Sequence, residues 1–289
     1  MLEDHAQGLL LGLALGESAG RRRREPGPDL SVVAQVLVVA ETLASGRGPE
    51  PATLLSGWAA QPVAAHSGSI TAEAVLLFES GLPVSEVAPA VARVIPGRSG
   101  DGPLTSCLPV ALACYQSGAA IKGWARKCAA ITHASPTSQL AAVATTLLTR
   151  DLITLGLPDC LARVSQALRS EAPRELLAAL RLPDPGEGLP EGDDAISLLA
   201  AAVQCLAEGS DWEESVAIGA SRSVPGDRLP ALVGAMAGAR WGRAALPGRG
   251  RDQLPPGLEE RLLGLASELV RLGLESTQAG SWQLEGQIS

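Results

Sequence analysis

Apolar residues recur along most of this chain three or four positions apart, which is the spacing of a helix that buries one face. In the segment 31–45 this apolar stripe consists of Val32, Val33, Val36, Val39 and Leu43. The sequence has no long run of alternating apolar and polar residues, the pattern of a half-buried strand. We therefore predict an all-α fold. The expected helices cover residues 3–19, 31–45, 51–59, 70–80, 84–94, 103–117, 119–131, 136–155, 158–170, 173–181, 195–208, 211–220, 229–242 and 256–272.

The succession of helices has one clear break. Residues 181–194 are rich in proline, glycine and acidic residues, which is typical of a loop. A single compact multi-helix bundle over residues 1–273 accounts for the pattern better than two domains do. The last residues, 274–289, are polar and aperiodic, and we expect them to form a flexible tail.

The first predicted helix carries a stripe of glycines. Gly8, Gly12, Gly16 and Gly20 recur every four residues, so they share one helix face. Each glycine costs a helix about 1 kcal/mol relative to alanine, and close packing against a neighbouring helix must offset that cost. Either the stripe brings Glu17 and the following loop beside a central cleft, or it serves tight packing alone.

Composition and charge exclude several classes of protein. Only 2% of the residues are aromatic, so leucine, alanine and valine must fill the core. The formal net charge is −8, and the arginine clusters have no aromatic or motif support, so we expect no binding to nucleic acid. The run Arg21-Arg-Arg-Arg24 is either a solvated loop or the rim of an anion site.

Cysteine use and hydropathy indicate a cytoplasmic protein. The cysteines at positions 107, 114, 128, 160 and 205 are odd in number and form no zinc spacing, so we expect buried thiols. The apolar run Leu9–Leu15 is too short to cross a membrane and has an acidic flank, unlike a signal peptide. We therefore expect no membrane association.

Four motifs then occur in order along the chain. Gly8-Leu-Leu-Leu-Gly-Leu-Ala-Leu-Gly-Glu-Ser-Ala-Gly20 is the first, and Gly100-Asp-Gly-Pro-Leu-Thr-Ser-Cys-Leu-Pro109 is the second. Ile131-Thr-His-Ala-Ser-Pro136 is the third, and Gly234-Ala-Met-Ala-Gly-Ala-Arg-Trp-Gly242 followed by Ala245-Leu-Pro247 is the fourth. In this order and spacing the chain resembles the ADP-ribosylglycohydrolase family, over about residues 5–273. The resemblance implies an all-α bundle with a two-magnesium centre, in a family whose founding bacterial members release ADP-ribose from modified arginine.

The metal motifs of that family are altered in this chain. The first, T-D-D-T, corresponds to Asp29-Leu-Ser-Val-Val33, where apolar residues replace the paired aspartates unless Asp29 takes one place. The second, G-G-D-T-D-T, corresponds to Ser223-Val-Pro-Gly-Asp-Arg228, which keeps only Asp227 and ends in arginine. Magnesium requires near-octahedral oxygen ligands with carboxylates to balance its charge. We therefore expect no metal site and no magnesium cofactor.

The resemblance and the residue types together suggest candidates for the site. Asp227 and Glu17 are the candidate catalytic carboxylates. Arg228, Asp101, Gly102 and His133 are the candidate ligand-binding residues. Arg228 either pairs with Asp227 or an anionic ligand where an ion would lie, or is a surface residue of a decayed loop.

The other candidates also have two interpretations. His133 either contacts a ligand or is a structural histidine at a helix end, and Asp101 either lines the pocket edge or ends a turn. Glu25, behind the four arginines, is either solvated or beside a substrate.

Three hypotheses for function follow. The first is a divergent member of the family that has lost magnesium-dependent hydrolysis and keeps a pocket for ADP-ribose or another small, nucleotide-like ligand. The second is a repurposed metal-independent enzyme that uses Glu17, Asp227 and Arg228 as an acid, base and cation set. The third is a structural or interaction scaffold, in which side chains such as Val32 and Val33 fill the former pocket.

Overall fold

The computed structural model covers all 289 residues and describes residues 1–20, 30–61, 69–184, 195–223 and 228–275. Helices dominate these ranges, which contain no strand, and the predicted all-α class is confirmed. The helices are α1 (Leu2–Gly20), α2 (Ser31–Ala44), α3 (Pro51–Ala59), α4 (Ser69–Glu79), α5 (Val84–Val94), α6 (Gly102–Ser106), α7 (Pro109–Ala113), α8 (Gly118–Ala130), α9 (Pro136–Leu152), α10 (Leu157–Leu168), α11 (Arg174–Ala179), α12 (Ala195–Glu208), α13 (Trp212–Arg222), α14 (Leu229–Trp241) and α15 (Leu258–Glu275). Two short 3₁₀ turns, Arg243–Ala245 and Arg251–Gln253, connect α14 to α15.

Most predicted helices lie within three residues of the observed bounds, but the helix predicted over residues 103–117 and the start of the predicted tail are wrong. Residues 103–117 form two short helices, α6 and α7, instead of one. Pro109 begins α7, because a proline lacks the N–H that an uninterrupted helix needs at that position. The predicted tail also starts too early, since α15 continues through Leu274 and ends at Glu275. The rest of the predicted tail lies outside the described residues.

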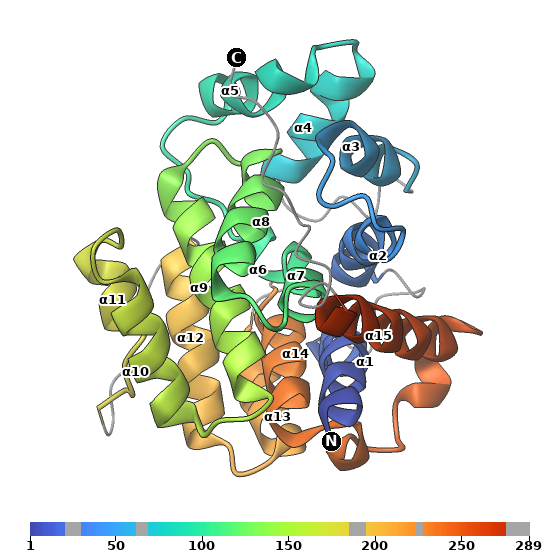
Figure 1. Ribbon diagram of the computed structural model, residues 1–289, viewed down its shortest axis with the longest axis vertical. Helices are drawn as coiled ribbons and strands as arrows, with labels where there is room; N and C mark the ends of the chain where they lie inside the picture. Colours follow the sequence, from blue (N-terminus) through green and yellow to red (C-terminus); the bar gives the residue numbers. More distant parts are fainter. Residues whose placement is uncertain (21–29, 62–68, 185–194, 224–227, 276–289) are drawn as a thin grey trace.

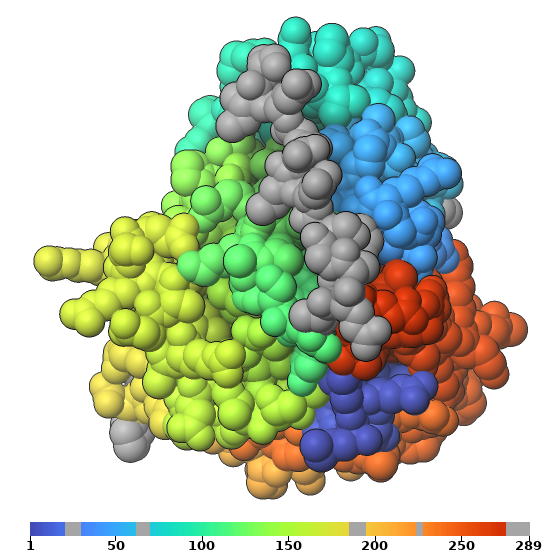
Figure 2. All heavy atoms as spheres, viewed as in Figure 1, coloured from blue at the N-terminus to red at the C-terminus, as the bar shows by residue number. Residues whose placement is uncertain are grey.

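The helices pack in one continuous arrangement around α1, α9 and α14 (Figure 1). Helices α12, α13 and α14 pack on one another, α9 packs on α8, α10 and α12, and α15 lies across α1, α2 and α7. Helices α3, α4 and α5 follow α2 in a series and form the upper end of the molecule in Figure 1. Helices α10 and α11 protrude at the left edge of both the ribbon and the space-filling view (Figure 2).

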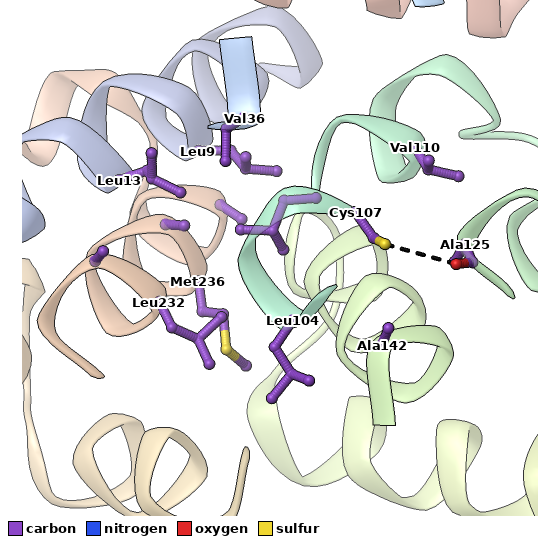
Figure 3. Close-up of a cluster of buried hydrophobic side chains, with 14 of the residues drawn as sticks. Leu9, Leu13, Val36, Leu104, Cys107, Val110, Ala125, Ala142, Leu232 and Met236 are labelled. Carbon is purple, nitrogen blue, oxygen red and sulfur yellow. Dashed lines mark hydrogen bonds between the residues drawn. The ribbon is translucent and has the colours of Figure 1, made fainter. Parts of the chain in front are cut away.

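Small aliphatic side chains fill the core, as the low aromatic content predicts. Leu9 and Leu13 of α1 lie near Val36 of α2 and Met236 of α14 in the close-up of the core (Figure 3). Cys107 lies in the same cluster, and its thiol is 3.5 Å from the carbonyl oxygen of Ala125. No helix of the described ranges is long and apolar enough to cross a membrane.

The glycine stripe of α1 brings its backbone into contact with the backbone of α14. A Cβ added at Gly8, Gly12 or Gly16 would collide with the carbonyl oxygen of Gly238, Gly234 or Pro230, respectively. The glycines of α14 face α1 in the same way, because a Cβ at Gly234 would collide with the carbonyl oxygen of Gly12. The stripe therefore serves tight packing, and this packing fixes where α14 begins relative to α1.

Replacing Gly12 with alanine tests the importance of this contact. We expect Gly12→Ala to lower the free energy of unfolding by about 2–3 kcal/mol, because the added methyl group meets a backbone atom that cannot rotate away. Gly264 of α15 is the matched control, because a Cβ there meets nothing within 4 Å. Gly264→Ala should raise stability by about 0.5–1 kcal/mol through its helix propensity. Urea unfolding measures both variants, and equal effects at the two positions would contradict the close-packing account.

Candidate functional site

Arg228 is the residue that brings the candidate site together. It precedes α14 and its side chain is buried, with the whole residue only 2% exposed. Its Nη1 donates to Oγ1 of Thr105 at 3.1 Å, and Nη1 and Nη2 both donate to Oε1 of Gln35 at 3.3 Å. Its Nε lies 3.4 Å from Oδ1 of Asp101. The guanidinium therefore connects α14 with α2, with α6 and with the residue that precedes α6.

The two hydrogen-bond acceptors of Arg228 are held in place by their own helices. Thr105 is fully buried in α6, and its hydroxyl donates to the carbonyl oxygen of Gly102 at 3.1 Å, so its lone pairs remain for Arg228. Gln35 is a buried polar residue in an otherwise apolar part of α2. A buried arginine is stable only when such acceptors satisfy its donors and an anion balances its charge. Among the described residues, Asp101 supplies such an anion.

Among Arg228 and the three residues that contact it, Asp101 is partly exposed to solvent. Its side chain is 29% exposed, whereas the side chain of Arg228 is 3% exposed. The predicted partner of Arg228 was Asp227, which lies outside the described residues, so its catalytic role stays a prediction. The alternative that Arg228 is a surface residue is wrong, because the hydrogen bonds to Gln35 and Thr105 hold it inside the protein.

His133 lies against the backbone that carries Asp101. A Cβ at Gly100 would be 2.6 Å from Nε2 of His133, and a Cβ at Gly102 would be 3.3 Å from its Cε1. Gly100 also has φ +55°, a left-handed conformation that glycine adopts most readily. The ring Nδ1 is 2.7 Å from Oγ1 of Thr132. The two glycines therefore leave the space that the imidazole fills.

The imidazole of His133 is held neutral. The residue is 3% exposed, and its burial lowers the pKa of the ring from 6.5 to about 3. The nearby cation of Arg228 lowers this pKa further by repelling a second positive charge. At neutral pH the described part of the site thus includes the guanidinium of Arg228, the carboxylate of Asp101 and an uncharged histidine.

Glu17, the other candidate catalytic carboxylate, stabilises the start of α2. Its Oε1 and Oε2 accept hydrogen bonds from the backbone N–H groups of Val32 and Val33, both at 2.9 Å. Leu30, the residue before α2, supplies no side-chain cap of its own. A carboxylate at a helix N-terminus satisfies unpaired N–H groups and interacts favourably with the helix dipole. Glu17 therefore acts as a capping residue that is contributed from another helix.

The cysteines belong to the core, as the sequence indicates. Cys107, Cys114, Cys128, Cys160 and Cys205 are all buried and free. Burial raises the pKa of Cys114 and of Cys160 to about 12, so these thiols are not ionised at neutral pH. They are therefore poor nucleophiles.

The described part of the site does not fit the two-magnesium centre that the resemblance implies. The oxygens of Gln35, Thr105 and Asp101 face a guanidinium, which would repel a metal ion at the same point. Within the described ranges no three histidine, cysteine, aspartate or glutamate side chains come together in a group that could hold a metal. Asp101 alone supplies too little negative charge for two divalent ions.

The sequence did not identify Gln35 and Thr105 as site residues. Gln35 interrupts the apolar run from Val32 to Val39, and this isolated polar position was the available signal. Thr105 lies inside the second motif between Asp101 and Pro109, with nothing in the local sequence to indicate its partner. Both act through Arg228, which lies 193 and 123 residues away, respectively.

The lowered pKa of His133 predicts a pH dependence of stability. The unfolded chain binds a proton on this ring at a pKa near 6.5, whereas the folded protein does so only near 3, so acid favours unfolding. Between about pH 7 and about pH 5 we expect His133 to account for a loss of about 2 kcal/mol. Urea unfolding at both pH values should give a smaller pH dependence for His133→Gln than for the unmodified protein. An unchanged pH dependence would mean that the ring is charged in the folded state.

Comparisons with known proteins agree with this geometry at the level of the fold. Residues 1–279 match the family model described as ADP-ribosylglycohydrolase. A solved structure, an "ADP-ribosylglycohydrolase-related protein complex", matches with a TM-score of 0.75 at 24% identity, covering 94% of this chain and 99% of that one. No curated protein sequence gives a significant match. The family match spans nearly the whole sequence, and the chain therefore belongs to the ADP-ribosylglycohydrolase family.

Proposed function

We propose that this protein binds a small nucleotide-like ligand of the ADP-ribose type without a two-magnesium centre, and that it does not hydrolyse ADP-ribosyl bonds. The observation that carries this proposal is the buried guanidinium of Arg228, which occupies the oxygens of Gln35, Thr105 and Asp101. Hydrolysis in this family depends on metal ions to orient the ribose and stabilise charge. A guanidinium offers directional donors and fixed charge but no bound water to activate.

The ligand class follows from the polar groups at the edge of the site. Asp101 is partly exposed, and its carboxylate is an acceptor for the hydroxyl groups of a ribose.

The alternative of a repurposed enzyme has less support. Such an enzyme would use Glu17 as an acid or base, but both oxygens of Glu17 already accept hydrogen bonds from α2. Those hydrogen bonds leave the carboxylate oxygens less available to a substrate.

The alternative of an interaction scaffold has one observation in its favour. Val32 and Val33, which stand at the position of the family's first metal motif, are 4% and 1% exposed and pack in the core. A ligand titration distinguishes this alternative from the proposed function.

Calorimetric titration of the full-length protein with ADP-ribose tests the proposal. We expect the same affinity in the presence of magnesium and of EDTA. Asp101→Asn should weaken binding by about tenfold, which corresponds to about 1.4 kcal/mol. Asp184→Asn is the matched control, because Asp184 forms an exposed ion pair with Arg181 and should not affect the affinity.

The other outcomes contradict the proposal in distinct ways. Binding that requires magnesium would contradict the metal-free site. Release of ADP-ribose from an ADP-ribosylated arginine peptide when magnesium is added would indicate a metal-dependent enzyme. If no heat of binding is seen under either condition and ADP-ribose does not raise the Tm, the interaction scaffold is favoured.

A further inference from the structure

Three oxygen atoms from two parts of the fold, α2 and the segment from Asp101 to Thr105, converge on the guanidinium of Arg228. Oε1 of Gln35 comes from α2, Oγ1 of Thr105 from α6, and Oδ1 of Asp101 from the residue that precedes α6. Gln35 and Thr105 are 3% and 0% exposed, so water does not readily replace the group that they contact. Converging oxygens around a buried point, with one carboxylate among them, are the arrangement of a cation site.

The positions of these oxygens do not depend on Arg228 alone. The hydroxyl of Thr105 is fixed by its hydrogen bond to the carbonyl oxygen of Gly102. The backbone carbonyl of Gln35 accepts from Nε1 of Trp58 at 3.2 Å, which ties this turn of α2 to α3. The backbone of Gly100, next to Asp101, accepts from the hydroxyl of Ser138 at 3.0 Å. The hydroxyl of Thr105 is therefore fixed independently of Arg228, and the surrounding helices hold the backbone on which Gln35 and Asp101 are carried.

We propose that this protein contains a built-in cation site in which Arg228 is the tethered occupant, and that shortening Arg228 opens the site to a free guanidinium-class cation from solution. The charge fits a cation, because the carboxylate of Asp101 lies 3.4 Å from Nε of Arg228. The directions fit a planar guanidinium, since two of its nitrogens reach Gln35, one of these also reaches Thr105, and Nε faces Asp101.

This inference rests on the metal-free part of the proposed function and not on the identity of the ligand. The two can fail separately. Loss of ADP-ribose binding would leave the cation site intact, whereas binding of magnesium by the unmodified protein would contradict both.

Chemical rescue of Arg228→Ala tests the inference. We expect this variant to melt about 5–10 °C below the unmodified protein, because it leaves Asp101 and two buried oxygens without their cation. Guanidinium chloride or methylguanidinium chloride at about 20 mM, far below denaturing concentrations, should recover at least half of that loss. Sodium chloride and magnesium chloride at the same ionic strength should recover none.

Two further variants serve as controls. Arg222→Ala removes an arginine that pairs with Glu208 at the surface, and guanidinium should not raise its Tm. Combining Arg228→Ala with Asp101→Asn removes the anion of the site, and the rescue by guanidinium should disappear.

Equal recovery with sodium chloride, or an equal guanidinium effect on the Arg222→Ala variant, would overturn the inference. So would a variant of Arg228 that is as stable as the unmodified protein. If Arg228→Ala does not fold by itself, the variant can be diluted from urea into guanidinium chloride or sodium chloride at about 20 mM, and its refolding in the two buffers is compared. Folded protein in the guanidinium buffer alone supports the site, and failure in both buffers contradicts it.

Discussion

The backbone contact between α1 and α14 is the constraint on which the rest of this structure depends. Gly8, Gly12 and Gly16 let α1 approach the carbonyl oxygens of α14 so closely that no side chain fits between them. This contact determines where α14 begins, and the residue that precedes α14 is Arg228. The same helix α1 carries Glu17, whose carboxylate caps α2. The glycines thereby position both the guanidinium and the helix that supplies Gln35.

The guanidinium of Arg228 differs from a metal ion in the chemistry that it can provide. A guanidinium cannot bind or activate a water molecule as a metal does, but it carries a permanent charge and donates in fixed directions. In the described part of the chain Asp101 pairs with this charge, and the adjacent imidazole of His133 stays neutral. On the proposed account, the family fold is retained around a cation that belongs to the polypeptide, and ligand binding then depends on shape and hydrogen bonding instead of metal coordination.

The fold could be predicted from the sequence because its signals are local. Helical periodicity identified α3, α5 and α12 with their observed bounds, and it failed at residues 103–117, where Pro109 separates two short helices. The composition also predicted a core of small aliphatic residues with buried thiols. Each of these features depends on residues within a few turns of one another, which a sequence pattern can represent.

The site could be predicted only in part, because its contacts link distant positions. The motifs pointed to Arg228, Asp101, Gly102 and His133, but not to the acceptors Gln35 in α2 and Thr105 in α6. They also suggested catalysis for Glu17, whereas the local need of α2 for a cap explains its contacts. A polar residue in an apolar run indicates a buried partner without identifying it.

A crystal structure tests most directly whether Arg228, and not a metal ion, lies among these oxygens. The crystals would be grown with a high concentration of manganese(II), and anomalous data would be collected at the manganese edge. Manganese takes the same oxygen ligands as magnesium and gives an anomalous signal that a guanidinium does not. The account predicts density for the guanidinium of Arg228 between Gln35, Thr105 and Asp101, with no anomalous peak there. An anomalous peak among these oxygens, with Arg228 displaced, would contradict it.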